Sequence, residues 1–141
     1  MSDYSVQLAD WQDDKEDLIA VRTRVFVDEQ KVPPELELDN QDSECTHFKA
    51  LDSDSNIIGT ARLLPNGYVG RMCVLKPHRN AGIGGLILQF IITHAQQQGF
   101  DKLALNSQKT ALNFYARYGF EADSDIFMEA GIEHVHMTLL L

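Results

Sequence analysis

Arginine and glycine are denser over residues 79–85 (Arg-Asn-Ala-Gly-Ile-Gly-Gly) than elsewhere in the chain, directly before an apolar helix pattern. The first backbone amides of a helix have no partner inside the helix, and the helix dipole makes that end partially positive. Glycine lets an anion approach the backbone closely because no Cβ atom intervenes. The segment therefore predicts an anion-binding loop with a phosphate group as ligand. A plain helix start with glycine packing is the alternative.

Two common phosphate-binding motifs do not fit this loop. A dinucleotide fingerprint needs a third glycine three residues after Gly84, where the chain has Ile87. A Walker loop needs Gly-Lys-Ser/Thr, whereas Gly85 is followed by Leu86 and Ile87. The loop is therefore predicted to bind its anion in another setting.

The pattern of apolar residues places the loop between a strand and a helix. Ile83, Leu86, Ile87, Phe90 and Ile91 follow helical spacing and predict one apolar face against a sheet, in a helix that ends at Gly99. Further helices are predicted over 13–30 and 110–118, and strands over 6–9, 45–51, 57–64, 68–75, 102–105 and 133–141. Residues 35–44 form a predicted loop with one helical turn. The fold class is therefore α/β or α+β with a mixed sheet.

Length and composition favour a single domain over residues 1–141. The chain is 44% hydrophobic and 23% charged, close to the average for soluble globular proteins. No apolar run approaches the roughly 18 residues of a membrane span, and the first residues show no secretory signal. Cys45 and Cys73 are too few for a disulfide framework and fit a reducing compartment. We therefore expect a cytoplasmic protein that does not bind membranes.

Charge is distributed unevenly along the chain. The net charge of −9 argues against nucleic-acid binding, which needs clustered cations. Residues 55–100 contain no acid, and their only charged side chains are Arg62, Arg71, Lys76 and Arg79. An acidic lip precedes this cationic window and consists of Asp28, Glu29, Glu35, Glu37, Asp39, Asp42 and Glu44. The lip is either a solvated surface or a feature that favours a cationic substrate beside a floor for an anionic cofactor.

Two further patterns carry a resemblance to a known family. The loop meets the pattern Gln/Arg-x-x-Gly-x-Gly/Ala at every fixed position, and residues 111–120 meet Ala-x-x-x-Tyr-x-x-x-Gly-Phe. The sequence thus resembles the GNAT superfamily of acetyl-CoA-dependent N-acyltransferases. Residues 24–30, Asp39, Asp42, His47 and residues 131–134 are similar to its ElaA-like branch. The resemblance implies one GNAT-like domain, with a mostly antiparallel sheet of six to seven strands and about four helices.

The resemblance also implies where acetyl-CoA would bind. Backbone groups of Met72, Cys73 and Val74 would pair with the pantetheine arm. The pyrophosphate would be held by Arg79, Asn80, Ala81, Gly82, Ile83, Gly84 and Gly85. Many relatives place an asparagine three residues before the helix alanine, but this chain has Gln108 there. Asn106 or Asn113 is the alternative pantetheine contact. Tyr115 would give a proton to the leaving thiolate, since a phenol is protonated at neutral pH.

Attack by an amine also needs a base, because an ammonium group has no free electron pair. Glu29, Asp39, Glu129 and His134 are the candidates. Glu29 is favoured because it lies where the first predicted helix ends beside the acidic lip. A water relay is equally compatible with the sequence, and each carboxylate has the alternative of a surface charge. For His134 the alternative is a structural histidine held by a hydrogen bond.

The predicted activity is direct acetyl transfer, in a ternary complex, from acetyl-CoA to a primary amine of a small molecule or peptide. The charge of the lip favours a cationic acceptor. An acyl-CoA sensor without turnover is the second hypothesis. Cys45, His47, His134 and His136 form a third, a zinc site, which is disfavoured because the family fold separates their strands. Cys73 is interpreted as a buried thiol rather than an acyl carrier. Homodimers are common among relatives, and the sequence has no signature for one.

Overall fold

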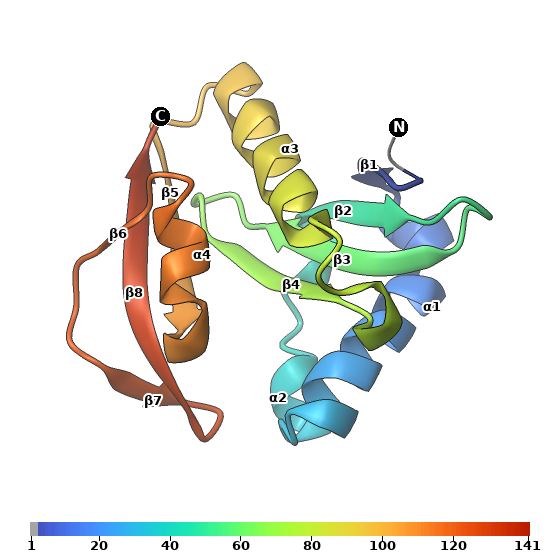
Figure 1. Ribbon diagram of the computed structural model, residues 1–141, viewed down its shortest axis with the longest axis horizontal. Coiled ribbons are helices and arrows are strands. Elements are labelled where there is room, and N and C mark those ends of the chain that lie inside the picture. The colour runs from blue at the N-terminus through green and yellow to red at the C-terminus, as the bar shows by residue number, and fades with distance from the viewer. Residues whose placement is uncertain (1–2) are drawn as a thin grey trace.

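The computed structural model describes residues 3–141 and contains eight strands and four α-helices (Figure 1). The strands are β1 (Ser5–Ala9), β2 (Thr46–Leu51), β3 (Ile57–Leu63), β4 (Val69–Val74), β5 (Lys102–Gln108), β6 (Glu121–Ala122), β7 (Phe127–Glu129) and β8 (Ile132–Leu140). The α-helices are α1 (Trp11–Arg22), α2 (Pro34–Glu37), α3 (Ile83–Gln97) and α4 (Leu112–Ala116). A π-helix, Thr23–Glu29, continues α1, and 3₁₀ turns lie at Asp42–Glu44, Lys76–His78 and Lys109–Ala111.

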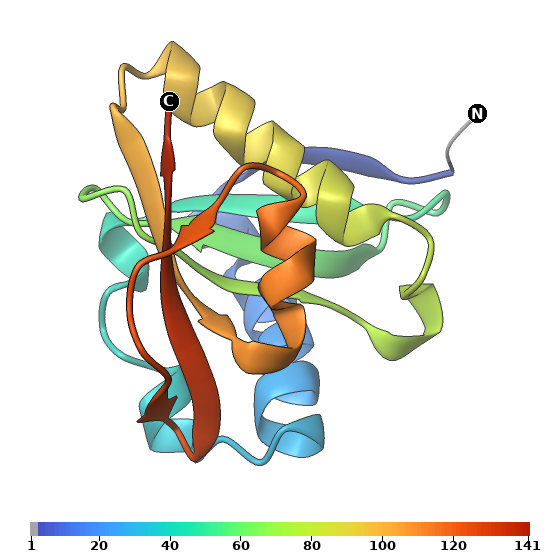
Figure 2. The ribbon, with the colours of Figure 1, turned by 60° about the vertical axis from the view of Figure 1, so that its left-hand side comes forward.

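The first sheet is antiparallel in the order β1-β2-β3-β4 and lies between two helices. In Figures 1 and 2, α1 covers one face of this sheet and α3 the other. Six of the seven β3 residues are buried, and they include the polar Thr60 and the charged Arg62. Asp10 caps α1, since its carboxylate accepts hydrogen bonds from the backbone amides of Gln12 and Asp13. The sheet therefore contributes to a core on both of its faces.

The second sheet pairs β5 with β8 and β8 with β6, while β7 pairs with another part of β8. In Figure 2, β8 stands upright beside the horizontally drawn strands of the first sheet. Within residues 3–141 the two sheets are joined by one parallel bridge, between Tyr68 and Ala104. The bridge lies directly before β4, and beyond it β4 and β5 separate. The inner edge of β4 is therefore left without a partner strand among the described residues.

The predicted fold class is confirmed. The eight strands exceed the expected six to seven by one, and two short strands fall outside the six predicted residue ranges. These are β6 and β7, which are too short for an alternating pattern to predict. The prediction that Leu86 belongs to the buried face of α3 is wrong, because this residue is 42% exposed. The buried stripe instead follows the side of the helix that faces the first sheet, at Ile83, Ile87, Leu88, Ile91, Ile92 and Ala95.

Helix length also bears on the expectation about membranes. No helix within residues 3–141 combines the length and the apolar character that a membrane span requires.

Candidate active site

A cleft of about 780 Å³ opens where β4 and β5 separate. Seven residues that the sequence singled out for acetyl-CoA or catalysis line it, namely Met72, Cys73, Val74, Arg79, Asn106, Gln108 and Tyr115. Three of the four candidate bases, Asp39, Glu129 and His134, line it too. Glu29, Asn113 and residues 80–85 are not part of the lining. The fold thus gathers, from four strands, one helix and two connecting segments, most of the residues that were predicted to act together.

The glycine loop ends at the start of α3 with its backbone in a left-handed conformation. Asn80 has φ 65° and Gly82 has φ 78°, and no side chain within residues 3–141 caps the helix that begins at Ile83. A Cβ atom added at Gly82 would meet no heavy atom within 4 Å. The first turn of this 15-residue helix therefore begins beside open space at Gly82, and its first amides have no side-chain cap among the described residues. This geometry fits an anionic group of extended shape, such as the pyrophosphate of a coenzyme.

The next two glycines of the loop have a different surrounding. A Cβ atom at Gly84 would lie 3.3 Å from Phe114 Cζ, and one at Gly85 would lie 2.1 Å from Tyr118 Oη. Gly84 thus faces Phe114 on α4, and Gly85 faces Tyr118 in the turn after that helix. Gly85 is therefore required for the close approach of Tyr118 to α3, a packing role that the loop motif does not reveal.

A β-bulge shapes the cleft side of β4. Arg62 pairs with Gly70 and Thr60 with Cys73, so two β4 residues lie opposite one β3 residue. Arg71 in the bulge has φ 51°, which is rare for a residue with a side chain. The Thr60 hydroxyl donates to the Arg71 carbonyl oxygen at 2.9 Å and holds the bulge. Sequence reasoning missed this feature, for which the isolated Gly70 within a strand was the available signal.

Burial changes the acidity of two uncharged groups of the cleft, the Cys73 thiol and the Tyr115 phenol. Burial raises the pKa of the Cys73 thiol to about 12, and the thiol lies 3.4 Å from the Thr60 hydroxyl. Burial also raises the pKa of Tyr115 to about 12. Tyr115 packs edge-on against the rings of Phe114 and Phe120. Both groups therefore keep their protons at neutral pH, so the thiol is a poor nucleophile and the phenol a usable acid.

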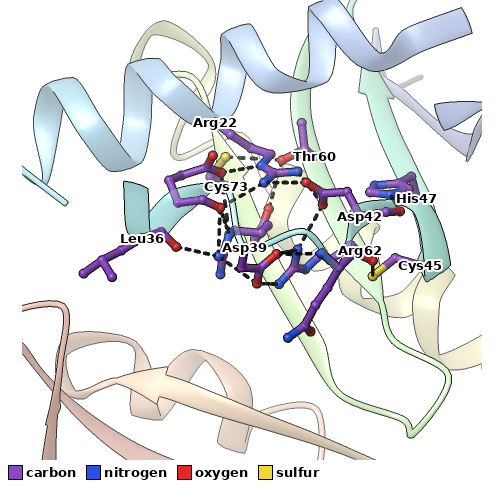
Figure 3. Close-up of polar contacts among 12 residues, drawn as sticks. Arg22, Leu36, Asp39, Asp42, Cys45, His47, Thr60, Arg62 and Cys73 are labelled. Atoms are coloured by element: carbon purple, nitrogen blue, oxygen red, sulfur yellow. Dashed lines mark hydrogen bonds and ion pairs between the residues drawn. The ribbon is translucent and has the colours of Figure 1, made fainter. Parts of the chain in front are cut away.

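Three arginines and three carboxylates form an ion-pair network beside the cleft, namely Arg22, Arg62 and Arg71 with Glu37, Asp39 and Asp42 (Figure 3). Arg22 Nη1 and Arg62 Nη1 both donate to Asp42 Oδ1 at 2.9 Å. Arg62 also donates hydrogen bonds to both carboxylate oxygens of Asp39. Hydrogen bonds from Arg62 hold the pKa of Asp39 well below its usual range. Burial opposes the same effect at Asp42, yet the hydrogen bonds from both arginines lower its pKa.

The pairing changes the interpretation of the acidic lip and the cationic window. Four of the seven lip carboxylates are bound to arginines, and three of the four cations of the window bind them. Arg62 and Arg71 therefore neutralise the lip instead of forming a cationic floor for a cofactor. Of the four cations in the window, Arg79 and Lys76 therefore remain as candidates to bind an anionic cofactor. Charges far apart in the sequence had no visible partner until the fold brought them together.

Glu29, the base predicted from the sequence, faces Arg79. Arg79 Nη1 and Nη2 donate to the two Glu29 oxygens at 2.9 Å each, and Arg79 Nε donates to the Val74 carbonyl oxygen at 2.8 Å. The hydrogen bonds from Arg79 lower the pKa of Glu29. A carboxylate held in this way accepts a proton less readily. The role of Glu29 stays a prediction, and its position supports control of the Arg79 orientation.

Gln108 and Asn106 project from β5 into the cleft and meet different partners. Gln108 Nε2 donates to Gln30 Oε1 at 2.8 Å, which ties the end of β5 to the end of the π-helix. Asn106 Nδ2 contacts Glu129 Oε1 at 3.4 Å. Asn113 is exposed on α4. Of the three amides predicted to contact pantetheine, two therefore lie in the cleft.

The residues of the zinc hypothesis lie at two separate sheets. Cys45 directly precedes β2, whereas His134 belongs to β8. His47 belongs to β2 and its Nε2 contacts the Asp42 carbonyl oxygen at 2.7 Å. His136 belongs to β8, where its ring contacts Tyr68 and Asp123. The described part of the chain has no group of three or more histidine, cysteine, aspartate or glutamate residues that could hold a metal ion.

Residues 5–141 match the family model described as an acetyltransferase (GNAT) domain. The chain belongs to the GNAT acetyltransferase family. The uncharacterized N-acetyltransferase YjcF of Bacillus subtilis (strain 168) is 37% identical over 124 residues, covering 86% of this chain and 89% of that protein. The crystal structure of Escherichia coli ElaA has a TM-score of 0.83 at 23% identity and covers 99% of both chains. A GNAT family acetyltransferase from Elizabethkingia anophelis, solved with acetyl-CoA bound, has a TM-score of 0.73 at 20% identity over 100% of both chains.

These relatives confirm the resemblance predicted from the two motifs. The GNAT fold is shared with ElaA along nearly the whole chain. The protein is therefore an enzyme of the GNAT N-acetyltransferase type, and the cleft between β4 and β5 is its candidate active site.

Proposed function

We propose that residues 1–141 act as one domain that transfers the acetyl group of acetyl-CoA to a primary amine of a small molecule or peptide. The observation that carries this proposal is the cleft between the separated strands, which Arg79 lines together with Tyr115. One lies at the anion-binding loop and the other on α4. A ligand that reaches from the loop into the cleft therefore spans the distance between them, as a coenzyme with a charged part and a reactive end would.

The residues of the loop and of β4 fit acetyl-CoA, which supplies an activated thioester when bound. Arg79 and the first amides of α3 would hold the pyrophosphate. The inner edge of β4, which has no partner strand among the described residues, would hydrogen-bond the pantetheine arm at Met72, Cys73 and Val74. The Val74 carbonyl oxygen already accepts from Arg79 Nε, so the arm would meet Arg79 at that end of the edge. Gln108 and Asn106 would contact it from β5. The acetyl-CoA bound to the Elizabethkingia anophelis relative supports this assignment.

Direct transfer fits the cleft better than an acyl-cysteine mechanism. The thiol of Cys73 is buried and its pKa is raised to about 12, so the thiolate needed for attack is scarce at neutral pH. Tyr115 would protonate the leaving thiolate, because burial keeps its phenol protonated across the physiological range. The free state of both cysteines is compatible with a cytoplasmic enzyme.

Calorimetric titration with acetyl-CoA, followed by a screen of amines for release of free CoA thiol, tests the proposal. Micromolar affinity, about −8 kcal/mol, and thiol release that depends on one amine class are expected. Binding without release on any amine would favour the acyl-CoA sensor. No binding would refute the proposed activity.

A further inference from the structure

The hairpin of β7 and β8 brings a carboxylate and an imidazole to the same side of the cleft. Its turn consists of Ala130 and Gly131, with φ 53° and 76°, which is the positive-φ pair of a tight two-residue hairpin turn. Glu129 pairs with Ile132 across this hairpin, and His134 lies two residues further along β8. Side chains two residues apart on a strand share a face. Glu129 and His134 therefore project together, and both line the cleft.

The neighbouring strand extends the same face. In the β5–β8 ladder, His134 pairs with Gln108, the residue that occupies the pantetheine-contact position of the family pattern. Asn106 lies two residues before Gln108 and contacts Glu129. The carboxylate and the imidazole thus lie beside the side chains proposed to hold the coenzyme arm.

The hydrogen bond of His134 fixes which ring nitrogen carries a proton in the neutral form. His134 Nδ1 lies 2.7 Å from the Ile132 carbonyl oxygen, and a carbonyl oxygen only accepts hydrogen bonds. Nδ1 is therefore the donor, and Nε2 has the free electron pair. The Phe127 ring stacks on the imidazole with centroids 6.0 Å apart. With the residue only 7% exposed, the ring is held in one orientation.

Glu129 differs from the other carboxylates of the cleft in having no cationic side-chain partner within residues 3–141. Its Oε2 lies 3.7 Å from His134 Nε2, and its side chain is 52% exposed. Glu37 and Asp39, which also line the cleft, are both bound to arginines. Glu129 is therefore the carboxylate that is free to bind an incoming cation.

The other charged groups near the imidazole come from the strand ends. Lys109 follows Gln108 and forms an exposed pair at 3.9 Å with Glu133. Glu133 precedes His134 and projects to the opposite face of β8. Among the described residues, Glu129 is thus the charged side chain within ion-pair distance of the His134 ring.

We infer that Glu129 and His134 form the acceptor site for a protonated amine, in which Glu129 binds the ammonium group and His134 Nε2 removes its proton. The inference rests on the proposed acetyl transfer and names the base of that reaction. Loss of the proton to His134 leaves an electron pair on the amine nitrogen, which forms the new C–N bond to the acetyl carbon as the C–S bond breaks. Tyr115 gives its proton to the departing sulfur and regains one from the nitrogen. His134 then releases its proton to solvent, so one amide, one thiol and one proton are formed.

Variants with matched controls separate these roles. His134→Asn retains a donor for the Ile132 carbonyl oxygen but cannot accept the proton. Glu129→Gln removes the charge, and Glu133→Gln is its control, because the Glu133 side chain is equally exposed at 52% but lies on the opposite face. The probes are spermidine, glucosamine, a lysine-containing peptide and hydroxylamine. Hydroxylamine is uncharged at neutral pH and needs no base.

The inference predicts a split between kcat and KM. At neutral pH, H134N should lower kcat for the accepted alkylamine about 10²- to 10⁴-fold and remove the acidic limb of the pH profile, while keeping the acetyl-CoA affinity and the rate with hydroxylamine. E129Q should raise KM for the alkylamine, whereas E133Q should not. An unchanged kcat and pH profile in H134N would overturn the inference while leaving acetyl transfer intact. Acceptance of hydroxylamine but of no alkylamine would also overturn it, and a wild-type protein that binds no acetyl-CoA would refute both proposals.

Discussion

The contact between Gly85 and Tyr118 gives a prediction whose size follows from two distances. An alanine Cβ at position 85 would lie 2.1 Å from Tyr118 Oη, far inside ordinary van der Waals contact, and 3.3 Å from Tyr118 Cζ. Overpacking of this kind costs about 1–3 kcal/mol. Alanine in place of glycine in a helix gains about 1 kcal/mol. Gly85→Ala should therefore lower the free energy of unfolding by up to about 2 kcal/mol.

Removing the tyrosine hydroxyl should reverse the sign. In Tyr118→Phe the nearest remaining atom is the ring carbon at 3.3 Å, which requires only a small shift. The alanine should then stabilise the protein by up to about 1 kcal/mol. The two changes together define a coupling of about 1–3 kcal/mol in a double-mutant cycle.

Urea unfolding of the wild type, both single variants and the double variant measures this coupling. Gly84→Ala is the matched control, because its Cβ would lie 3.3 Å from Phe114 and its effect should be the same with or without the Tyr118 hydroxyl. If Gly85→Ala has equal effects in the two backgrounds, the two residues do not touch and the packing role of Gly85 is refuted.

Three further predictions concern the cofactor, the proton donor and acid stability. Gly82→Val should weaken calorimetric binding of acetyl-CoA and cost about 1–2 kcal/mol of stability, because φ is 78° at this position; unaltered affinity would refute its place beside the pyrophosphate. Tyr115→Phe should reduce kcat with nearly unchanged acetyl-CoA affinity, and equal turnover would exclude the phenol as acid. Asp39 and Asp42 have pKa values below those of the unfolded chain, so their stabilisation is present above about pH 4 and is lost as pH falls below it. Urea midpoints from pH 7 to pH 3 should therefore drop, and less steeply in Asp42→Asn.

Local sequence patterns predict those parts of the site that are built from residues close together in the chain. Arg79, Gly82 and Tyr115 belong to short motifs in which spacing alone indicates a loop and a helix. The strands and helices that hold them follow from apolar periodicity and turn residues. The motif residues and the apolar periodicity together were therefore sufficient to predict the family and the fold class.

Long-range pairing explains what the sequence did not reveal. The partner of Arg79 is Glu29, fifty residues away, and that pair bears on which group serves as base. The tight turn at Ala130 and Gly131 brings Glu129 beside His134, yet an Ala-Gly dipeptide is a weak hairpin signal. Charge counts also overstated the negative charge of the acidic lip, because a count does not indicate which carboxylates form ion pairs with arginines in the folded protein.

The single bridge between Tyr68 and Ala104 has a consequence for solubility. A sheet edge with free amide and carbonyl groups is a template on which other chains can add a strand and aggregate. Here the edge of β4 lies inside a cleft whose other wall is β5, so a neighbouring protein chain would have to enter the fold to reach it. A narrow, extended molecule would reach the same groups without that cost. The fold therefore exposes backbone hydrogen-bonding groups to a small ligand while withholding them from other proteins.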